Sequence, residues 1–308
     1  MLALNNIAFT PTERVHSGLG NQLYNYAALM GIASMHGYDY CVPLVHPECP
    51  TPGVGRFMLV DCFDLPGITL AYAELPMYHN PSFNFNPALF LTCQDNVSLC
   101  GCFFSDKYFN HIEKDIRKTY TFKPHILEEC VRVRSTVTEG DVIAVQIRRG
   151  DYSDPYWNVG ICKLEYYLEA LRNIYNRVGK KPVFIFSDDP LWCMSALQGN
   201  QYYFIVDRMS SQPRCHGNPN MHKNSYTEES INIKNRNVIW VTDHIRSLCL
   251  MSLCNHFIIS NSTYGIWGAW LAKDKGLSIR PRLLWSLASS EAASKDYYPN
   301  GWESLPAW

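Results

Sequence analysis

The second half of the chain alternates short apolar runs with segments of helical periodicity, and this alternation restricts the fold more than any other feature. Apolar runs typical of buried strands cover residues 142–147, 182–187, 202–206 and 256–261. Patterns typical of helices cover residues 163–179, 244–255 and 263–273. Strands that alternate with helices indicate an α/β fold, with a parallel sheet covered by helices on both faces. Ligands of such sheets bind beyond the carboxyl ends of the strands.

The first half of the chain has a different character. Residues 43–105 are rich in Pro, Gly and aromatic residues, which predicts short strands and many loops. One helix is expected over residues 21–37, with Gly37 as its C-terminal cap. A length of 308 residues suggests about two domains. We therefore expect an N-terminal domain over residues 1–136, a C-terminal domain over residues 137–285, and a tail over residues 286–308 that packs back on the N-terminal domain.

The bulk composition argues against several classes of protein. The formal net charge is −1, so a general attraction to nucleic acid is not expected. No apolar run is long enough to predict a membrane span, and the N-terminus lacks the pattern of a signal peptide. The expected compartment is the cytoplasm, with the lumenal domain of a Golgi enzyme that lacks its anchor as the alternative. The 12 cysteines form no Cys-x-x-Cys pair, and buried free thiols are the simplest interpretation, with disulfides left open.

Polar residues follow three of the predicted strands directly. They are Arg148, Arg149, Gly150 and Asp151 after the first strand, Ser187, Asp188 and Asp189 at the second, and Ser260, Asn261, Ser262 and Thr263 at the fourth. Carboxyl ends of parallel strands meet at one edge of a sheet, so these clusters are expected to lie together. Two adjacent arginines present planar donors that match phosphate oxygens, and a helix start favours an anion. The sequence therefore predicts a site for a phosphate-bearing ligand.

Each cluster also has a structural interpretation. The two arginines can form ion pairs with Asp151 and Asp188 without any ligand. The Ser-Asn-Ser-Thr run can cap a helix, and the Ser-Asp-Asp run can cap the turn that follows its strand. The glycine loop at residues 18–22 allows the backbone to approach a ligand, but a plain turn is the simpler interpretation. The coincidence of three polar clusters on one edge favours a binding site over these separate explanations.

Five segments, in this order, match a known pattern: GLGNQLYNYA (18–27), CGCFFSDKYF (100–109), VIAVQIRRGDY (142–152), FIFSDDPLWC (184–193) and FIISNSTYGIWGAWLA (257–272). Together they resemble glycosyltransferase family 11, the family of the α-1,2-fucosyltransferases. The resemblance implies a GT-B-type fold, with two Rossmann-like domains facing a cleft. It also implies an inverting transfer of fucose from GDP-fucose, as co-substrate, to a glycan acceptor. The acceptor group would be the 2-OH of a galactoside, and no metal or other cofactor is required.

The resemblance also implies roles for individual residues. Arg148 would contact the β-phosphate of GDP-fucose, with support from Arg149. The donor-binding set would further include Gln146, Asp188, Asp189, Ser260, Asn261, Ser262 and Thr263 from the second domain, and Gly20, Asn21 and Gln22 from the first. Arg148 and Asp151 are the candidate catalytic residues. Glu13 and His16 are further candidates for the base.

The chain departs from the family pattern at three places. The family usually carries His two residues before the first arginine, where this chain has Gln146, which cannot carry charge. Residues 263–267 read Thr-Tyr-Gly-Ile-Trp instead of the family's Ser-Phe-Ser-Trp-Trp. The polar segment 208–237 resembles an insertion. Three alternatives therefore stay open: another fucosyl linkage, a GDP-mannose-dependent enzyme, and a catalytically silent protein that binds GDP or glycans.

Overall fold

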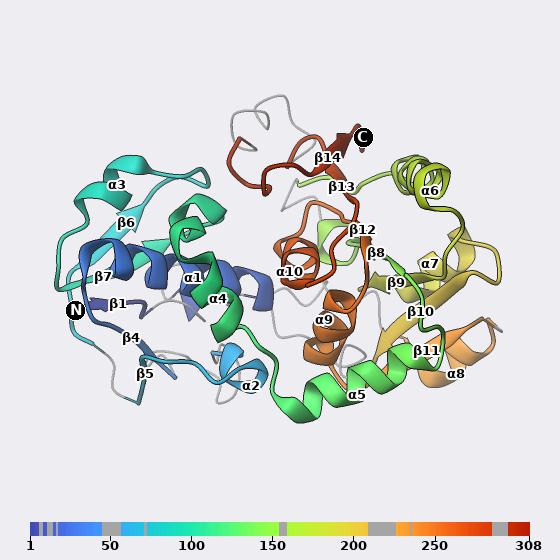
Figure 1. Ribbon diagram of the computed structural model, residues 1–308, viewed down its shortest axis with the longest axis horizontal. Coiled ribbons are helices and arrows are strands. Elements are labelled where there is room, and N and C mark those ends of the chain that lie inside the picture. The colour runs from blue at the N-terminus through green and yellow to red at the C-terminus, as the bar shows by residue number, and fades with distance from the viewer. Residues whose placement is uncertain are drawn as a thin grey trace. The chain divides into compact units, whose positions relative to one another are not determined.

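The computed structural model describes residues 1–5, 9–10, 15–16, 18–44, 57–70, 73–153, 159–208, 226–234, 236–284 and 295–308. These residues form two compact α/β units (Figure 1). Unit 1 contains the described residues up to 123 together with residues 295–299. Unit 2 contains the described residues from 124 to 284 together with residues 300–308.

Unit 1 is built on a parallel sheet with the strand order β5-β4-β1-β7-β6. Its strands are β1 (Leu2–Ala3), β4 (Tyr40–Pro43), β5 (Ile68–Thr69), β6 (Met77–Asn80) and β7 (Val97–Gly101). A separate antiparallel pair joins β2 (Phe9–Thr10) to β3 (Val15–His16). Most of these strands are two to five residues long, as the loop-rich composition of residues 43–105 predicts.

Helix α1 (Leu19–His36) is the main helix of unit 1 and contacts β1 and β4. Nearly all of its residues from Leu19 to Ala33 are buried. The helix ends where predicted, at Gly37, whose left-handed backbone (φ 69°) suits glycine and whose N–H bonds the carbonyls of the last turn. The shorter helices are α2 (Leu59–Cys62), α3 (Pro87–Thr92), η1 (Asp106–Tyr108), η2 (Asn110–Ile112) and α4 (Glu113–Thr119).

Unit 2 carries a parallel sheet of seven described strands in the order β11-β10-β9-β8-β12-β13-β14. The strands are β8 (Ile143–Ile147), β9 (Val183–Ser187), β10 (Tyr202–Asp207), β11 (Val238–Val241), β12 (His256–Ile258), β13 (Ser278–Pro281) and β14 (Glu303–Leu305). The four strands predicted from apolar runs are all present. The expectation of an α/β fold with parallel sheets is therefore confirmed.

The helices of unit 2 cover both faces of its sheet. They are α5 (Pro124–Ser135), η3 (Asp151–Ser153), α6 (Leu164–Val178), α7 (Pro190–Ala196), α8 (Glu228–Asn232), α9 (His244–Ser252) and α10 (Thr263–Leu271). Ile143, Val145 and Ile147 of β8 belong to one buried core with residues of α6 and α7. Side chains alternate along a strand, so Ala144 and Gln146 face the other side of the sheet. On that side α9 contacts α10 and α5 (Figure 1).

The boundary between the units differs from the expected one. We expected the second domain to begin at residue 137, but α5 already belongs to unit 2. Helix α5 packs against α9. Arg246 of α9 donates from Nε to Glu129 Oε2 of α5 at 2.6 Å. The backbone carbonyl of Arg246 accepts from Cys130 Sγ of α5. Helical periodicity shows that α5 is a helix but not which core it joins, because its partner lies more than 100 residues later.

The tail also differs from the expected arrangement. Residues 295–299 belong to unit 1. Residues 300–308 instead belong to unit 2, where β14 pairs in parallel with β13 (Ile279 opposite Glu303). Strand β14 is short and partly exposed, so its sequence lacks the apolar run that marks the central strands.

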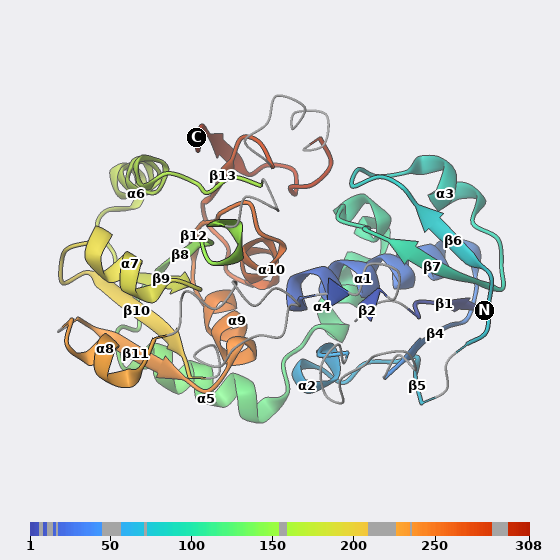
Figure 2. The same ribbon diagram turned by 180° about the vertical axis from the view of Figure 1, so that it is seen from behind.

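The segment 208–237 is partly structured. Its last part forms α8, which begins with a capping box between Thr227 and Ser230. Figure 2 shows α8 beside β10 and β11 at one end of the sheet. Residues 209–225 lie outside the described part of the chain.

The cysteines agree with the simplest interpretation of their number. Every described cysteine is a free thiol, and all but Cys102 are buried. Cys49 and Cys215 lie outside the described residues. In the same described residues, no helix has the length and apolar character needed to cross a bilayer.

Candidate functional site

The strand order of unit 2 contains a reversal between β8 and β12. From β8 the chain adds β9, β10 and β11 on one side, and it then returns to add β12, β13 and β14 on the other. Doubly wound sheets bind ligands at such a reversal, in the crevice beyond the carboxyl ends of the two central strands. The residues that follow β8 and β12 are Arg148 to Asp151 and Ser260 to Thr263. Two of the three predicted polar clusters therefore flank the reversal.

Arg148 leaves β8 between two carboxylates. Its Nη2 lies 2.7 Å from Asp151 Oδ1, and its Nη1 lies 3.1 Å from Asp188 Oδ2. Burial acts to lower the pKa of Arg148, but the charges of Asp188 and Asp151 outweigh it and the pKa is raised. The guanidinium is 27% exposed and uses one terminal nitrogen for each partner. With five N–H groups, it keeps donors for a further acceptor.

Arg149 is held in a different way. Its guanidinium lies over the ring of Trp192, 3.9 Å from the ring centre, and its Nε lies 3.1 Å from Asp189 Oδ2. Its backbone N–H donates to Asp188 Oδ1 at 2.9 Å. Asp188 thus binds the side chain of one arginine and the backbone of the next. The two arginines form one rigidly supported cationic pair.

The carboxylates after β9 serve these contacts. Asp188 binds both arginines, and Asp189 pairs with Arg149 while it also caps α7 by accepting from Trp192 N at 3.2 Å. The resemblance placed both carboxylates in the donor-binding set. The contacts seen are the structural ion pairs that the sequence left open. The pairs do not oppose a binding site, since they fix the directions of the arginine N–H groups.

The loop that follows β12 is buried and tightly bonded. Ser260 donates to Gln146 Oε1 through both its backbone N–H (3.2 Å) and its hydroxyl (2.6 Å). Asn261 donates through Nδ2 to the carbonyls of Val159, Gly160 and Leu284, at 3.0 to 3.3 Å. Both side chains are at most 1% exposed. Sequence analysis placed them in the donor-binding set, whereas their polar atoms bond to the protein.

Helix α10 begins at this loop. Its N-cap, Ser262, has extended backbone and a carbonyl that accepts from Ile266 N, but its side chain makes no capping hydrogen bond. The hydroxyl of Ser262 therefore does not satisfy the amides of the first turn. Tyr152 connects this helix start to the arginines, because its hydroxyl donates to Asn261 O (3.2 Å) while Arg148 lies over its ring. An uncapped helix start beside two arginines suits an anion.

The glycine loop belongs to unit 1. Gly20, Asn21 and Gln22 lie in the first turn of α1, where Gly20 and Gln22 are buried and Asn21 is half-buried. Gln22 Oε1 accepts from Met58 N at 2.8 Å, so this carboxamide holds neighbouring backbone. Gly18 precedes the helix as its N-cap without a side chain. The contact with Met58 gives Gln22 a structural role, and Asn21 is the most exposed of the three residues.

Of the three candidate bases, the structure describes the side chain of Asp151 alone. Its carboxylate pairs with Arg148, which gives it an orienting contact. Glu13 lies outside the described residues, and His16 is described only as part of β3. Within the described ranges, no three His, Cys, Asp or Glu side chains are grouped to hold a metal ion.

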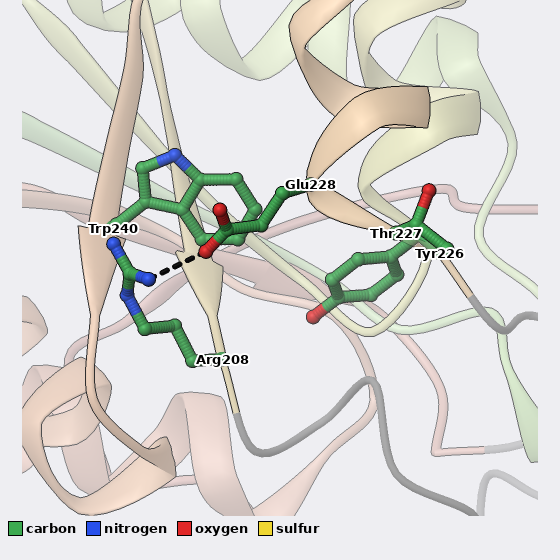
Figure 3. A pocket seen from close by; sticks show the side chains of 5 residues that line it. All are labelled: Arg208, Tyr226, Thr227, Glu228 and Trp240. Carbon is green, nitrogen blue, oxygen red and sulfur yellow. Dashed lines mark hydrogen bonds and ion pairs between the residues drawn. The ribbon is translucent and has the colours of Figure 1, made fainter.

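Sequence reasoning missed two aromatic residues and one pocket. Trp192 lies under Arg149 from the first turn of α7, and Tyr152 links the loop after β8 to the loop after β12. The sequence could have indicated both, because each is an aromatic residue within four positions of the arginine or aspartate cluster. The pocket, of about 240 Å³, is lined by Arg208, Tyr226, Thr227, Glu228 and Trp240 (Figure 3). There Arg208 pairs with Glu228 and lies over Trp240, at the carboxyl end of β10.

Comparison with known proteins gives a consistent result. The sequence pattern of the family described as "Glycosyl transferase family 11" matches residues 4–208 and 223–305. The unmatched residues between these ranges fall within the segment 208–237, in keeping with an insertion there.

Two relatives are similar over much of the chain. Galactoside alpha-(1,2)-fucosyltransferase 2 of Sus scrofa is 24% identical over 82% of this chain and 67% of its own length. An alpha-1,2-colitosyltransferase of Escherichia coli is 25% identical over 60% of this chain and 55% of its own length. The matches thus span between about half and two thirds of these relatives.

Among solved structures, the fucosyltransferase NodZ from Bradyrhizobium has a similar fold. It aligns with a TM-score of 0.51 at 13% identity, over 88% of this chain and 92% of NodZ. This likeness concerns the fold, and it agrees with the two α/β units and their parallel sheets.

Proposed function

The chain belongs to glycosyl transferase family 11, and on this basis we propose that it transfers fucose from GDP-fucose to a hydroxyl group of a glycan acceptor. The acceptor group in the proposal is the 2-OH of a galactoside, in keeping with the name of the Sus scrofa relative. The observation that carries the proposal is the supported arginine pair beside the uncapped start of α10, at the reversal of the strand order.

The proposed site binds the diphosphate between these elements. Arg148 donates to the β-phosphate from the N–H groups that are not bonded to Asp151 or Asp188. Arg149 adds a second positive charge next to Arg148. The amides at the start of α10, with Ser262 and Thr263, face the same phosphates. Asp188 and Asp189 act in this proposal by holding the arginines, and Gln146, Ser260 and Asn261 by holding the loop.

The proposed reaction is a direct displacement that inverts the anomeric carbon. The acceptor oxygen forms a bond to this carbon, the bond from the carbon to the β-phosphate oxygen breaks, and GDP leaves with the electron pair. The acceptor hydroxyl gives up its proton to the departing diphosphate or to water. Negative charge grows on the phosphate as the bond breaks, so Arg148 stabilises the transition state more than the ground state. A preorganised donor of this kind contributes about 3–4 kcal/mol, or a factor of about 10²–10³ in rate.

Asp151 has a defined place in this mechanism. It was a candidate base, and its Oδ1 lies 2.7 Å from Arg148 Nη2. We assign it to orienting Arg148. The reaction as proposed needs no metal, since the arginines and the helix start supply the positive charge. Transfer that persists unchanged in excess EDTA would support this assignment, and restoration by Mg²⁺ or Mn²⁺ after EDTA treatment would contradict it.

The decisive experiment replaces Arg148. We expect Arg148→Ala to lower fucose transfer by about 10²–10³ while the protein stays folded. Arg148→Lys keeps the charge without the planar donors and should recover only part of the rate. The matched control is Arg172→Ala, which removes an exposed arginine from α6. Near wild-type transfer by Arg148→Ala would refute the diphosphate assignment.

The sugar and the linkage need a separate experiment. One relative is named a colitosyltransferase, so the transferred sugar is a point of variation among similar proteins. A panel of GDP-fucose, GDP-mannose and GDP-colitose, each with galactose-terminated and other acceptors, identifies donor and linkage. The proposal expects GDP-fucose and a galactoside to react fastest. Binding of GDP without transfer from any donor would instead favour a silent binding protein.

A further inference from the structure

Gln146 is a buried amide in the middle of the unit 2 sheet. It occupies the fourth position of β8, between two residues that face the core under α6, and it therefore points to the face that α10 covers. It is 5% exposed. A buried carboxamide is costly unless its polar atoms are hydrogen-bonded. The hydrogen-bond partners of Gln146 therefore indicate its structural role.

The bonds of Gln146 fix the direction of its amide. Ser260 donates to Oε1 from both its backbone nitrogen (3.2 Å) and its hydroxyl (2.6 Å). A backbone N–H can only donate, so the oxygen and not the nitrogen of the amide must face Ser260. Among the described residues, no hydrogen bond uses Gln146 Nε2. The amide thus holds the loop on one side and directs its own donors away from it.

Gly265 leaves the space that this amide fills. A Cβ on residue 265 would lie 2.6 Å from Gln146 Oε1 and 3.2 Å from the Cβ of Ile259. The amide cannot move away cheaply, because Ser260 holds it in a buried position. Glycine is a poor helix residue, yet Gly265 is the third residue of α10. Its place next to the amide supplies a physical reason for it.

We propose that Gln146 and Gly265 act as one positioning unit for the start of α10. Gly265 admits the amide, the amide fixes Ser260, and Ser260 fixes the chain that enters α10 three residues later, at Thr263. The helix start then presents its amides to the diphosphate in one geometry. This inference rests on the proposed function for the identity of the ligand, whereas the pairing of the two residues rests on the contacts alone.

The pairing unites two departures from the family pattern. The family pattern that the chain resembles has His and Ser at these positions, where the chain has Gln146 and Gly265. The two positions are adjacent, since a Cβ on residue 265 would lie 2.6 Å from Gln146 Oε1. The side chain of Gln146 and a Cβ at position 265 compete for the same space. Gln146 and Gly265 are positioning residues here and need not touch the sugar.

A double-mutant cycle tests the pair on the full chain. The variants are Gln146→Ala, Gly265→Ala and the double substitution, each measured for GDP affinity by calorimetry and for thermal unfolding. We expect Gly265→Ala alone to weaken GDP binding about tenfold, because the new Cβ displaces the amide from Ser260. In the Gln146→Ala background the same substitution should cause no further loss. Its effect on the melting temperature should there be smaller, because only the 3.2 Å contact with the Cβ of Ile259 remains once the amide is gone.

The cycle separates this proposal from its alternatives. Equal effects of Gly265→Ala in both backgrounds, on affinity and on unfolding, overturn the pairing. A fall in melting temperature with unchanged GDP affinity and unchanged KM for GDP-fucose overturns the positioning of the helix start. The exchange Gln146→His with Gly265→Ser should bind GDP better than either single substitution, and a double variant no better than the worse single one counts against the pair.

The outcome also distinguishes this proposal from the proposed function. If the wild-type chain binds no GDP, the diphosphate assignment fails. The coupling in thermal unfolding needs no ligand, so it still decides whether Gln146 and Gly265 act together.

Discussion

A Cβ on residue 150 would lie 2.5 Å from Asp188 Oδ2. The glycine between Arg149 and Asp151 therefore allows Asp188 to approach the loop after β8 and to hold both arginines. Asp188 is fixed by these contacts, so it has little room to give way.

Gly150→Ala tests this relationship. The new methyl group should push Asp188 away from Arg148 and Arg149 and leave their guanidinium groups less ordered. We expect GDP affinity to fall about tenfold, or about 1.4 kcal/mol, with a smaller change in stability. Isothermal calorimetry measures the affinity. Gly140→Ala is the matched control, because its Cβ would meet nothing closer than Thr138 Oγ1 at 3.5 Å. Equal GDP affinity in both variants would show that Asp188 tolerates the displacement.

Trp192 offers a second test of the arginine pair. Trp192→Leu removes the ring under Arg149 and keeps the ion pair with Asp189. A partly exposed cation–π contact contributes about 1 kcal/mol, so we expect the KM for GDP-fucose to rise about fivefold with little change in kcat.

The pocket at the end of β10 supplies the control for this substitution. Trp240→Leu removes a ring from under Arg208 in the same unit. We expect it to leave the KM for GDP-fucose unchanged. A rise in KM for this variant, equal to that of Trp192→Leu, would place the pocket within the donor site.

The central part of unit 2 could be predicted from the sequence because its elements satisfy simple rules. Strands β8 and β9 are buried along their length, so they appear as apolar runs, and α6 shows its apolar face at helical spacing. Strands β11 and β14 were missed because they lie toward the ends of the sheet, where burial is incomplete and the apolar signal weakens.

The candidate site could be located from the sequence, but its contacts could not. Parallel topology brings residues 148–151, 187–189 and 260–263 to one edge, whatever their partners. Which polar atoms face a ligand depends on pairings between distant residues, such as Gln146 with Ser260, 114 positions apart. Asn261 illustrates the limit, because a polar residue in the predicted site has its side chain committed to three backbone carbonyls.

Because of these three hydrogen bonds, we expect a substitution of Asn261 to lower the free energy of unfolding strongly. Asn261→Asp keeps the shape but replaces the donating nitrogen with an oxygen, which leaves three carbonyls without this donor and buries a charge. We expect a loss of at least about 3 kcal/mol and a fall in melting temperature on the order of 10 °C. Asn176→Asp, at an exposed position of α6, is the control. Differential scanning calorimetry compares the two, and similar melting temperatures would mean that the loop finds other donors.

The raised pKa of Asp106 in η1 should make the stability of unit 1 depend on pH. Burial raises the pKa of Asp106 from 3.8 to about 6, partly offset by the charge of Lys107. The folded state therefore holds this proton more tightly than the unfolded state between these values. Its stabilising contribution is complete below about pH 4 and is lost as the pH rises to about 6.

Denaturant unfolding across this pH range checks the prediction. Asp106→Asn should remove the decline in the free energy of unfolding that this group causes between pH 4 and 6, whereas Asp115→Asn, an exposed position of α4, should preserve it. An unchanged pH profile in Asp106→Asn would assign the decline to other groups.

The path of the last described residues has a practical consequence. Residues 295–299 belong to unit 1, whereas β14 pairs with β13 in the sheet of unit 2. Neither unit is therefore a continuous stretch of sequence. A gene fragment that starts at Pro124 would encode β14 but also a piece of unit 1 without its partners, and a fragment that stops at Lys123 would lack that piece. Separate expression of the two units therefore requires circular permutation or transfer of the tail segment, and a single cut between residues 123 and 124 is not enough.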